Sequence, residues 1–568
     1  MKPNIILFHD ISELINKFNE IESNLLSLNQ SNIDEILELI TSSIFVSNKD
    51  FYYILLLSLN FIMESRPFKD SLYKKVLLYF KEDYQEKYFF EDENEIISIF
   101  MFNEIALYHL GINKTSDEIR RMDHLSGTYP TPYRYNPRYF SNDLFEKSIR
   151  EDDIDTFQTL ISRTNKDLSS SYVTCPSVNP LGYFSKINVN QIHFISFSAF
   201  CGSLRIFKYL WMNRKGDDEG VPNELVLCAI AGGNYEIIHI LDEFIRNEKF
   251  SLMAAIRFFR FELIEYLIET CEFEIGLNEL LVSIHCYNYK FFCDNCKRLF
   301  ELNKKDFLKV VFFAADCGNT LVLNYVSDSL QFDLSQSSIK TNILIESVFK
   351  ERINVLRFIF FDNVFSINYD QKTASIQKRP LFDLNKILNG IPAFNGLAIL
   401  HLVASNQLFK VANFFLSDEF RIDHQVFIDV NVVDFTGTAP LHWSVLFQHF
   451  EMFKLFISKS NASFIHHQDL KKFLVNVNAV NIHGQNILHM ACNNMAHDIL
   501  KFILENEIID PKTEDNSNEN LFHYAARCGI NYIFDYSCVK NLPNDVFSKK
   551  NGSTNLSFNW ITFSLFHL

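Results

Sequence analysis

Three blocks between residues 434 and 529 repeat one pattern, and this repetition constrains the fold more than any other feature of the chain. Each block begins with Asp or Asn, has Gly or Asn three residues later, and then reaches a His. The blocks begin at Asp434, Asn481 and Asp515, and their histidines are His442, His489 and His523. Asp and Asn bond their own backbone in turns, and Gly tolerates positive φ. The pattern therefore predicts a turn followed by a helix in every block.

Small residues follow each histidine, at Ser444, Ala491 and Ala525. Such residues allow another helix to pack closely against the first. Large apolar residues then recur three and four apart, which predicts a second helix packed back on the first. One pair of helices cannot bury its apolar face alone, so the copies must stack.

The pattern resembles the ankyrin repeat, whose signature is Thr-Pro-Leu-His-x-Ala in a period near 33 residues. The segment 439–442 keeps the Pro and the His, 486–489 keeps the His without the Pro, and 520–523 keeps the His alone. The histidines are 47 and 34 residues apart, so the first interval carries an insertion of about 13 residues. The resemblance implies an all-α, ankyrin-like α-solenoid of helix-turn-helix repeats with short β-hairpin turns.

Weaker copies without the histidine precede these blocks, beginning near residue 141. Their equivalent positions are 31, 26, 28, 31 and 33 residues apart, at Gly202, Gly233, Phe259, Tyr287, Gly318 and Glu351. A further copy contains His401. We expect about eleven units, with trimmed hairpin turns where the spacing is short. Such an array is similar to the degenerate arrays of large protist ankyrin families.

The chain is expected to contain six segments. They are a helical N-terminal module that also caps the array (1–125), a Pro- and Tyr-rich linker (126–140), degenerate ankyrin-like repeats (141–365), an insertion (366–392), clearer ankyrin repeats (393–538), and an incomplete terminal repeat or cap, unless the sequence is truncated (539–568). Further insertions are expected at about 165–192 and 458–473.

Charge and composition narrow the class of partner. The formal net charge of the 568 residues is −16, and the absence of a basic stripe argues against nucleic acid and anionic lipid. The apolar run Phe51–Met63 is too short to span a bilayer, so we expect no membrane anchor. Eleven cysteines without a secretory start favour reduced thiols and a cytoplasmic, intracellular location.

The histidines and cysteines are the candidates for chemistry. No Ser or Cys recurs beside the repeat histidines, and in the ankyrin pattern this His bonds neighbouring backbone. Cys293 and Cys296 have the C-x-x-C spacing of a zinc site, with Cys271, His285 and Cys286 upstream. A second matching pair is missing, and the positions fall in repeat helices, so we expect core thiols. We predict no catalytic residue, no cofactor and no metal.

The sequence therefore favours a monomeric interaction protein, a scaffold or adaptor that binds a partner protein through the concave face of the array. The tips of the turns are the candidates for contact, because the other fixed positions are used for packing. These tip residues are Phe435, Thr436, Ile482, His483, Asn516 and Ser517. The acidic array favours a basic partner. In the alternative hypothesis, residues 1–125 form a catalytic or regulatory domain and the array recruits its substrate.

Overall fold

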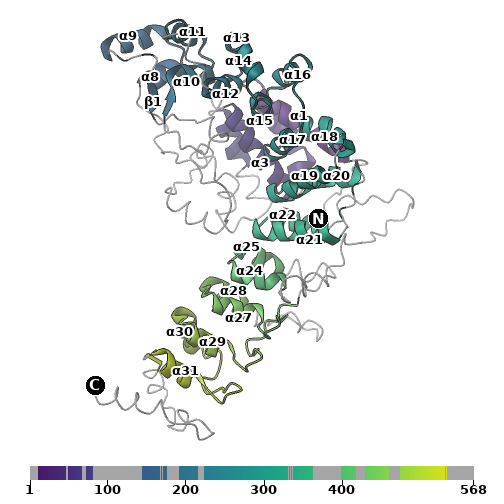
Figure 1. The fold of residues 1–568 in the computed structure, drawn as a ribbon, viewed down its shortest axis with the longest axis vertical. Helices are drawn as coiled ribbons and strands as arrows, with labels where there is room; N and C mark the ends of the chain where they lie inside the picture. The colour runs from purple at the N-terminus through teal and green to yellow at the C-terminus, as the bar shows by residue number, and fades with distance from the viewer. Residues whose placement is uncertain are drawn as a thin grey trace, which may run out of the picture. The chain divides into compact units, whose positions relative to one another are not determined.

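The computed structural model describes most of the repeat region and part of the N-terminal region. The described residues are 11–46, 49–66, 72–80, 144–164, 171–174, 191–214, 223–302, 304–330, 337–361, 398–417, 429–458 and 474–530, with a few single positions between them. Figure 1 shows the described helices and strands as a ribbon coloured along the chain. The chain divides into two compact units. Unit 1 comprises Met1–Leu334 with Ile367–Tyr369, and unit 2 comprises Ser335–Ser366 with Asp370–Leu568.

Unit 1 begins with helices that lack the repeat pattern, and we call these described helices the N-terminal module. They are α1 (Ile11–Leu26), α2 (Ile33–Thr41), the 3₁₀ helix η1 (Ile44–Val46), α3 (Lys49–Ser65) and a helix over 72–80. In α1, the buried residues Leu14, Phe18, Ile21 and Leu25 recur three and four apart. This spacing places them on one side of the helix, which packs against α3.

The described part of unit 1 then contains six helical pairs. They are α8 (Leu144–Arg150) with α9 (Ile154–Thr164), α10 (Phe194–Cys201) with α11 (Leu204–Met212), α12 (Asn223–Gly232) with α13 (Tyr235–Ile240) and α14 (Asp242–Asn247), α15 (Ser251–Arg257) with α16 (Phe261–Glu269), α17 (Leu277–His285) with α18 (Tyr289–Leu302), and α19 (Lys304–Cys317) with α20 (Thr320–Asp328). The first helices of these pairs pack side by side in chain order. Before α10, β1 (Tyr172–Thr174) and β2 (Gln191–His193) form a two-stranded antiparallel sheet.

Unit 2 continues the same architecture. Its described helices are α21 (Ser337–Phe349) with α22 (Ile353–Phe361), α24 (Ile399–Ser405) with α25 (Phe409–Phe415), α27 (Pro440–Leu446) with α28 (Phe450–Ser458), α29 (Ile487–Asn493) with α30 (His497–Glu505), and α31 (Leu521–Cys528). Helices α24, α27, α29 and α31 stack in order on one side, and α22, α25, α28 and α30 stack on the other. The predicted all-α solenoid of paired helices is confirmed.

A residue with left-handed backbone joins the two helices of each pair. All six positions that the sequence aligned, from Gly202 to Glu351, have positive φ. The corresponding residues in the remaining pairs have positive φ as well, and they are Asp152, Gln407, Gln448, Met495 and Gly529. This conformation reverses the chain within a few residues. The predicted repeat register is therefore correct, and we call the edge formed by these turns the turn edge.

Short connections and small residues also agree with the sequence. Helix α18 ends at Leu302 and α19 begins at Lys304, so no room is left for a hairpin between these pairs. Ser444, Ala491 and Ala525 are buried where first helices touch. The predicted linker 126–140, the insertion 366–392 and the terminal segment 539–568 lie outside the described residues, as do most of 165–192 and 458–473 and all of 81–125.

The N-terminal module packs against the middle of the unit 1 repeats, whereas the sequence suggested a cap on the first pair. Helix α1 contacts α18 and α20, and the ring centroids of Phe18 and Tyr289 are 4.9 Å apart. The ring of Phe61 lies 5.3 Å from that of His285 and 5.8 Å from that of Tyr287. The N-terminal module is held at this position by the aromatic residues of the middle repeats. The spacing of apolar residues along the chain does not indicate which surface those aromatic residues contact.

Unit 1 lacks the repeat histidines and links its repeats at the turn edge with asparagines. The Nδ2 atoms of Asn234, Asn288 and Asn319 donate to carbonyl oxygens of the preceding pair at 3.1, 3.1 and 3.2 Å. The Oδ1 atom of each also accepts a backbone N–H in the first turn of its own second helix. One side chain thus caps a helix and ties two repeats together.

Candidate functional site

Three hairpin turns of unit 2 form the candidate site, and we call residues 433–438, 480–485 and 514–519 the tip row. In each turn, the residue three positions after the initial Asp or Asn donates its backbone N–H to that residue's carbonyl oxygen, at 2.9, 2.9 and 3.0 Å. The donors Gly437, Gly484 and Asn518 all have positive φ. The turns predicted from the Asp/Asn-x-x-Gly/Asn spacing are therefore confirmed.

The side chain of the first residue holds each turn closed. Asp434 Oδ1 accepts the backbone N–H groups of Thr436 and Thr438 at 2.8 and 3.0 Å. Asn481 and Asp515 make the equivalent pair of bonds in their own turns. Burial alone would raise the pKa of Asp434, but the hydrogen bonds to its carboxylate outweigh burial and lower it. The carboxylate of Asp434 is therefore used for hydrogen bonds within the turn and is not available to a partner protein.

Neighbouring tips are bonded to one another. The Ile482 N–H donates to Thr436 O at 3.0 Å, and the Asn516 N–H donates to His483 O at 3.1 Å. The Asn516 side chain also donates to Ile482 O at 3.0 Å. These bonds place the tips edge to edge, so the row is one rigid strip.

All six predicted contact residues lie in this strip and are exposed. Phe435 and Ile482 are the most exposed large apolar residues of unit 2 among those described, at 73% and 59%. Val433 and Val480 are exposed beside them. Thr436 and Asn516 differ from the others because their side chains bond within the strip. Binding by these residues stays a prediction, but the structure brings them together.

The repeat histidines link successive repeats. In each, Nδ1 accepts the backbone N–H of the residue that precedes the helix, for example from Ala439 to His442 at 3.2 Å. On the other side of the ring, the Nε2 atoms of three histidines meet carbonyl oxygens of the following turn. The bonds are His401 to Thr438 at 2.8 Å, His442 to Ala479 at 3.0 Å and His489 to Thr513 at 2.9 Å.

This geometry defines the protonation state of these three histidine rings. Because Nδ1 accepts a hydrogen bond and Nε2 donates one, each of the three rings is neutral. Burial lowers the pKa of His442 to about 4 and lowers the pKa values of His401 and His489 as well. The predicted structural role is confirmed for His401, His442 and His489, since backbone groups occupy both nitrogens of each ring.

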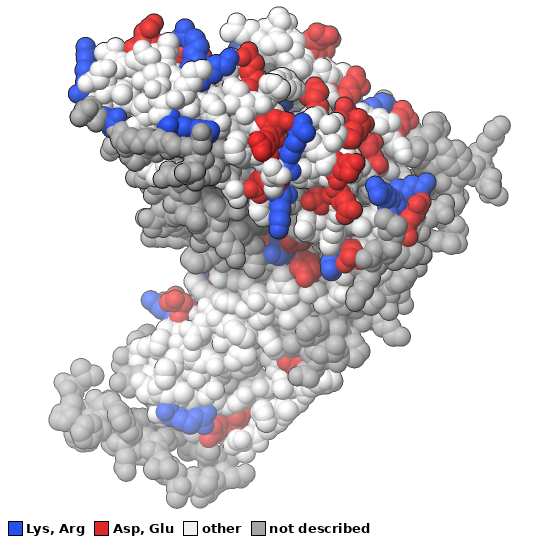
Figure 2. Space-filling view, turned by 45° about the horizontal axis from the view of Figure 1, so that its top comes forward, with Lys and Arg blue, Asp and Glu red and all other residues white. Residues whose placement is uncertain are grey.

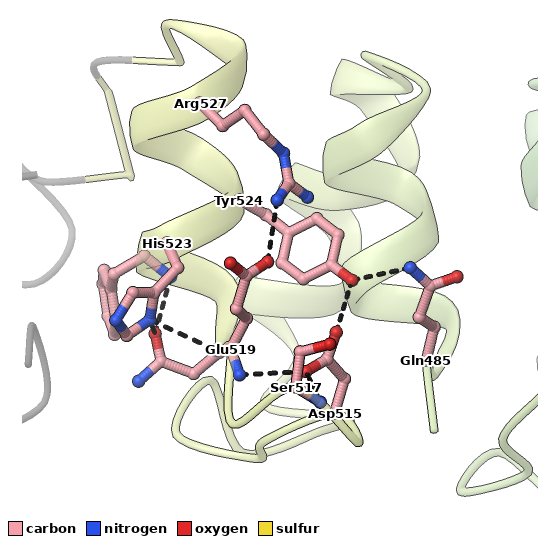
Figure 3. A network of polar contacts seen from close by, with 9 residues as sticks. Gln485, Asp515, Ser517, Glu519, His523, Tyr524 and Arg527 are labelled. Atoms are coloured by element: carbon pink, nitrogen blue, oxygen red, sulfur yellow. Dashed lines mark hydrogen bonds and ion pairs between the residues drawn. The ribbon is translucent and has the colours of Figure 1, made fainter. Parts of the chain in front are cut away.

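An aromatic residue nine positions after the Asp ties two of the tips to their helices, and the sequence analysis missed it. Trp443 Nε1 donates to Asp434 Oδ2 at 3.0 Å. In the last described tip, the Tyr524 hydroxyl donates to Asp515 Oδ2 at 2.7 Å and accepts from Gln485 Nε2 at 2.6 Å (Figure 3). The repeated Asp-to-aromatic spacing was the available signal.

Arg527 completes the network in Figure 3. Its guanidinium lies 4.4 Å from the centre of the Tyr524 ring and bonds Glu519 at 2.7 Å. A charged pair thus covers an aromatic ring at the last described tip. The first two tips have no equivalent pair, because 433–438 contains only Asp434 as a charged residue and 480–485 contains none.

Charge is distributed unevenly between the units. Helices α24, α27 and α29, which adjoin the tip row, contain no Asp, Glu, Lys or Arg. Acidic side chains gather instead on a face of unit 1 (Figure 2). Exposed members on its second helices and the following turn are Glu236, Glu243, Glu262, Glu265, Glu269, Glu272 and Glu274. The net charge of the chain therefore does not describe the tip row.

The cysteines of the C-x-x-C motif lie on α18. Cys286 and Cys296 are buried, as predicted for core thiols, and burial raises the pKa of Cys296 to about 12. Cys286 Sγ lies 3.8 Å from Ile256 O, which accepts its weak hydrogen bond. Within the described ranges, no group of three or more His, Cys, Asp and Glu residues could hold a metal ion.

Comparison with known families identifies the repeats. A family model described as ankyrin repeats (3 copies) matches residues 461–546, which include the second and third tips. The chain contains ankyrin repeats. Ankyrin repeats are in general protein–protein interaction modules, and two of the three tips of the tip row lie in this part of the chain. No curated protein matches the chain. None of the helices described has the length and apolar character needed to cross a membrane.

Proposed function

We propose that this ankyrin-repeat protein is a scaffold or adaptor that binds a partner protein through the tip row of unit 2 and catalyses no reaction. The observation that carries the proposal is a rigid strip whose polar groups bond inward while Phe435 and Ile482 project outward. Exposed apolar side chains on a pre-organised surface are typical of protein interfaces. Because the turns are already closed, little conformational entropy is lost on binding.

The partner is expected to contact the strip with apolar side chains. The first two tips and their helices present almost no charge, so an ion pair cannot supply the central contact there. The net charge of −16 still favours a basic partner during approach, because electrostatic steering acts over a Debye length of about 8 Å. The association rate should therefore fall as salt rises, while the dissociation rate changes little.

We further propose that the protein acts as a monomer in a reducing, cytoplasmic compartment. Several of its thiols, including Cys286, Cys296 and Cys492, are buried in the array, where oxidation would disturb packing. The alternative of an independent N-terminal catalytic or regulatory domain has less support, because the described module is packed into the repeats through Phe18 and Phe61.

The test is partner capture by the full chain from cells that express it. The variant Phe435→Ser/Ile482→Ser should lose most of the captured partner, while its melting temperature stays near that of the wild type because both side chains are exposed. A matched control is Met212→Ser/Tyr235→Ser, which removes exposed side chains from second helices of unit 1. Unchanged capture by the tip variant with an intact fold would refute the proposal.

A further inference from the structure

The turn edge of unit 1 already binds helices. Phe258 is 4% exposed and Tyr287 is 3% exposed, and both residues are contacted by the N-terminal region. Phe61 of α3 packs against Tyr287, and Arg66, just after α3, donates to Phe258 O at 3.1 Å. Aromatic side chains and the carbonyl groups that end the first helices therefore form the receptor for these helices.

The same edge of unit 2 carries apolar residues at equivalent positions but is uncovered. Phe258 and Phe447 each precede the left-handed residue of their pair, and Phe447 is 46% exposed. Tyr287 and Met495 both occupy the left-handed position, and Met495 is 53% exposed. Leu446, next to Phe447, is 39% exposed. Equivalent positions are thus buried under helices in one unit and open in the other.

The uncovered edge is held in place by its own contacts. The ring of Phe447 stacks on that of Trp443 at a centroid distance of 5.6 Å and on that of His449 at 6.1 Å. Gln448 Nε2 donates to Asn494 O at 2.9 Å, which joins the turns of two successive pairs. Phe447 and Met495 are therefore neighbours on an ordered surface, and no refolding is needed for a ligand to reach them.

Acidic residues at the start of the second helices, beside the turn edge, occur in both units. In unit 1, Glu262 stands three residues after the left-handed Phe259, and its charge acts on Arg66 of the docked module. In unit 2, Glu451 and Asp498 stand three residues after Gln448 and Met495 and are exposed. Glu451 also pairs with Lys454 at 2.8 Å in an exposed ion pair that a partner's Lys or Arg can join or replace. An acidic residue thus begins the second helix after Phe259 in unit 1 and after Gln448 and Met495 in unit 2, which fits a basic residue beside the apolar face of a bound helix.

We propose that the turn edge of unit 2, formed by Leu446, Phe447 and Met495 with Glu451 and Asp498 at its rim, is a second protein-binding surface. Its occupant is an amphipathic helix of a partner protein that presents aromatic and aliphatic side chains with an adjacent Lys or Arg. This surface lies at the opposite end of the first helices from the tip row, so one protein can hold two partners, as a scaffold requires.

A displayed library of helical peptides with one randomised face, selected on the full chain, tests the proposal. Enriched peptides should combine aromatic or aliphatic residues with Lys or Arg. Their binding should weaken by at least about tenfold in Leu446→Ser/Phe447→Ser and, independently, in Met495→Ser. The tip variant Phe435→Ser/Ile482→Ser should bind these peptides like the wild type. A failure of the turn-edge proposal is therefore distinguishable from a failure of the tip-row proposal.

Two further arms complete the test. Glu451→Gln/Asp498→Asn should weaken peptides that contain Lys or Arg and leave the melting temperature unchanged. A photo-crosslinking residue in place of Phe447 should join the bound peptide. Crosslinking without peptide to another segment of the chain, or to a second copy, would overturn the proposal by naming a different occupant. Failure to enrich helical peptides, or enriched peptides that are insensitive to the turn-edge variants, would overturn it as well.

Discussion

Acid should weaken unit 2 through its buried histidines, and His442 is the residue on which this effect is best measured. Its ring is fully buried, and both nitrogens bond backbone in the neutral form. A proton on Nδ1 would break the bond from Ala439 and leave a charge in an apolar interior. In the unfolded chain the same ring takes up a proton near its ordinary pKa of 6.5.

The sign and size of the effect follow from the two pKa values. The native pKa of His442 is lowered to about 4, so between pH 6.5 and pH 4 the unfolded state binds more protons than the native state. The free energy of unfolding therefore falls as the pH falls through this window. A shift of that size corresponds to about 3 kcal/mol for this one residue. The lowered pKa of Asp434 acts below 3.8, outside the window.

Urea unfolding between pH 7.5 and 4.5, followed by the fluorescence of Trp443, would measure the effect. Replacing Trp211 and Trp560 with Phe leaves Trp443 as a reporter in unit 2. His442→Gln should be less stable than the wild type at pH 7.5, and the difference in the free energy of unfolding should shrink by about 2.5 kcal/mol at pH 4.5, because the full effect is reached only below the native pKa. The control His483→Gln removes an exposed tip histidine and should leave the profile unchanged. A constant gap between wild type and His442→Gln across this range would refute the reasoning.

Four further perturbations test the packing and the cysteines. Ala491→Leu places a large side chain where first helices touch and should destabilise unit 2 by roughly 1–3 kcal/mol; a wild-type melting curve would contradict the register. Gly529→Ala should cost about 1 kcal/mol through backbone strain alone, because φ is +71° and an added Cβ meets nothing within 4 Å; an unchanged urea midpoint would contradict it. Phe18→Ala should destabilise unit 1 by about 3 kcal/mol and speed hydrogen exchange in α18 and α20, whereas exchange confined to α1 would speak against docking of the module. Protein purified without chelator should contain no stoichiometric zinc, and one zinc per chain that is lost in Cys293→Ser/Cys296→Ser would overturn the assignment as core thiols.

Local chemistry let the sequence predict the repeat register in both units. A turn from Asp434 to Gly437 depends on residues three positions apart, and a helical pair depends on spacings of three and four. The same frame located left-handed residues as dissimilar as Gly202, Phe259 and Glu351. The exposure of the six tip residues followed from this frame, since a tip between two packed helices points away from the core.

Contacts between distant parts of the chain were decided by the tertiary structure. The repeats without histidine are joined by Asn234, Asn288 and Asn319, whose partners lie about 30 residues away, near one repeat period. A pattern defined by the missing histidine could not indicate this replacement. The docking of the N-terminal module on Tyr287 and Tyr289 joins residues still further apart.

Some surface properties can be read from the sequence, and others depend on the tertiary structure. The net charge is a sum over all residues and can be read from the sequence. The acidic face of unit 1 and the nearly uncharged surface of the first two tips of unit 2 depend on which side chains the fold brings to one surface. Phe258 and Phe447 occupy the same position of the repeat and are equally apolar. One is buried and the other is exposed, because burial is determined by what packs against a residue and not by the residue itself.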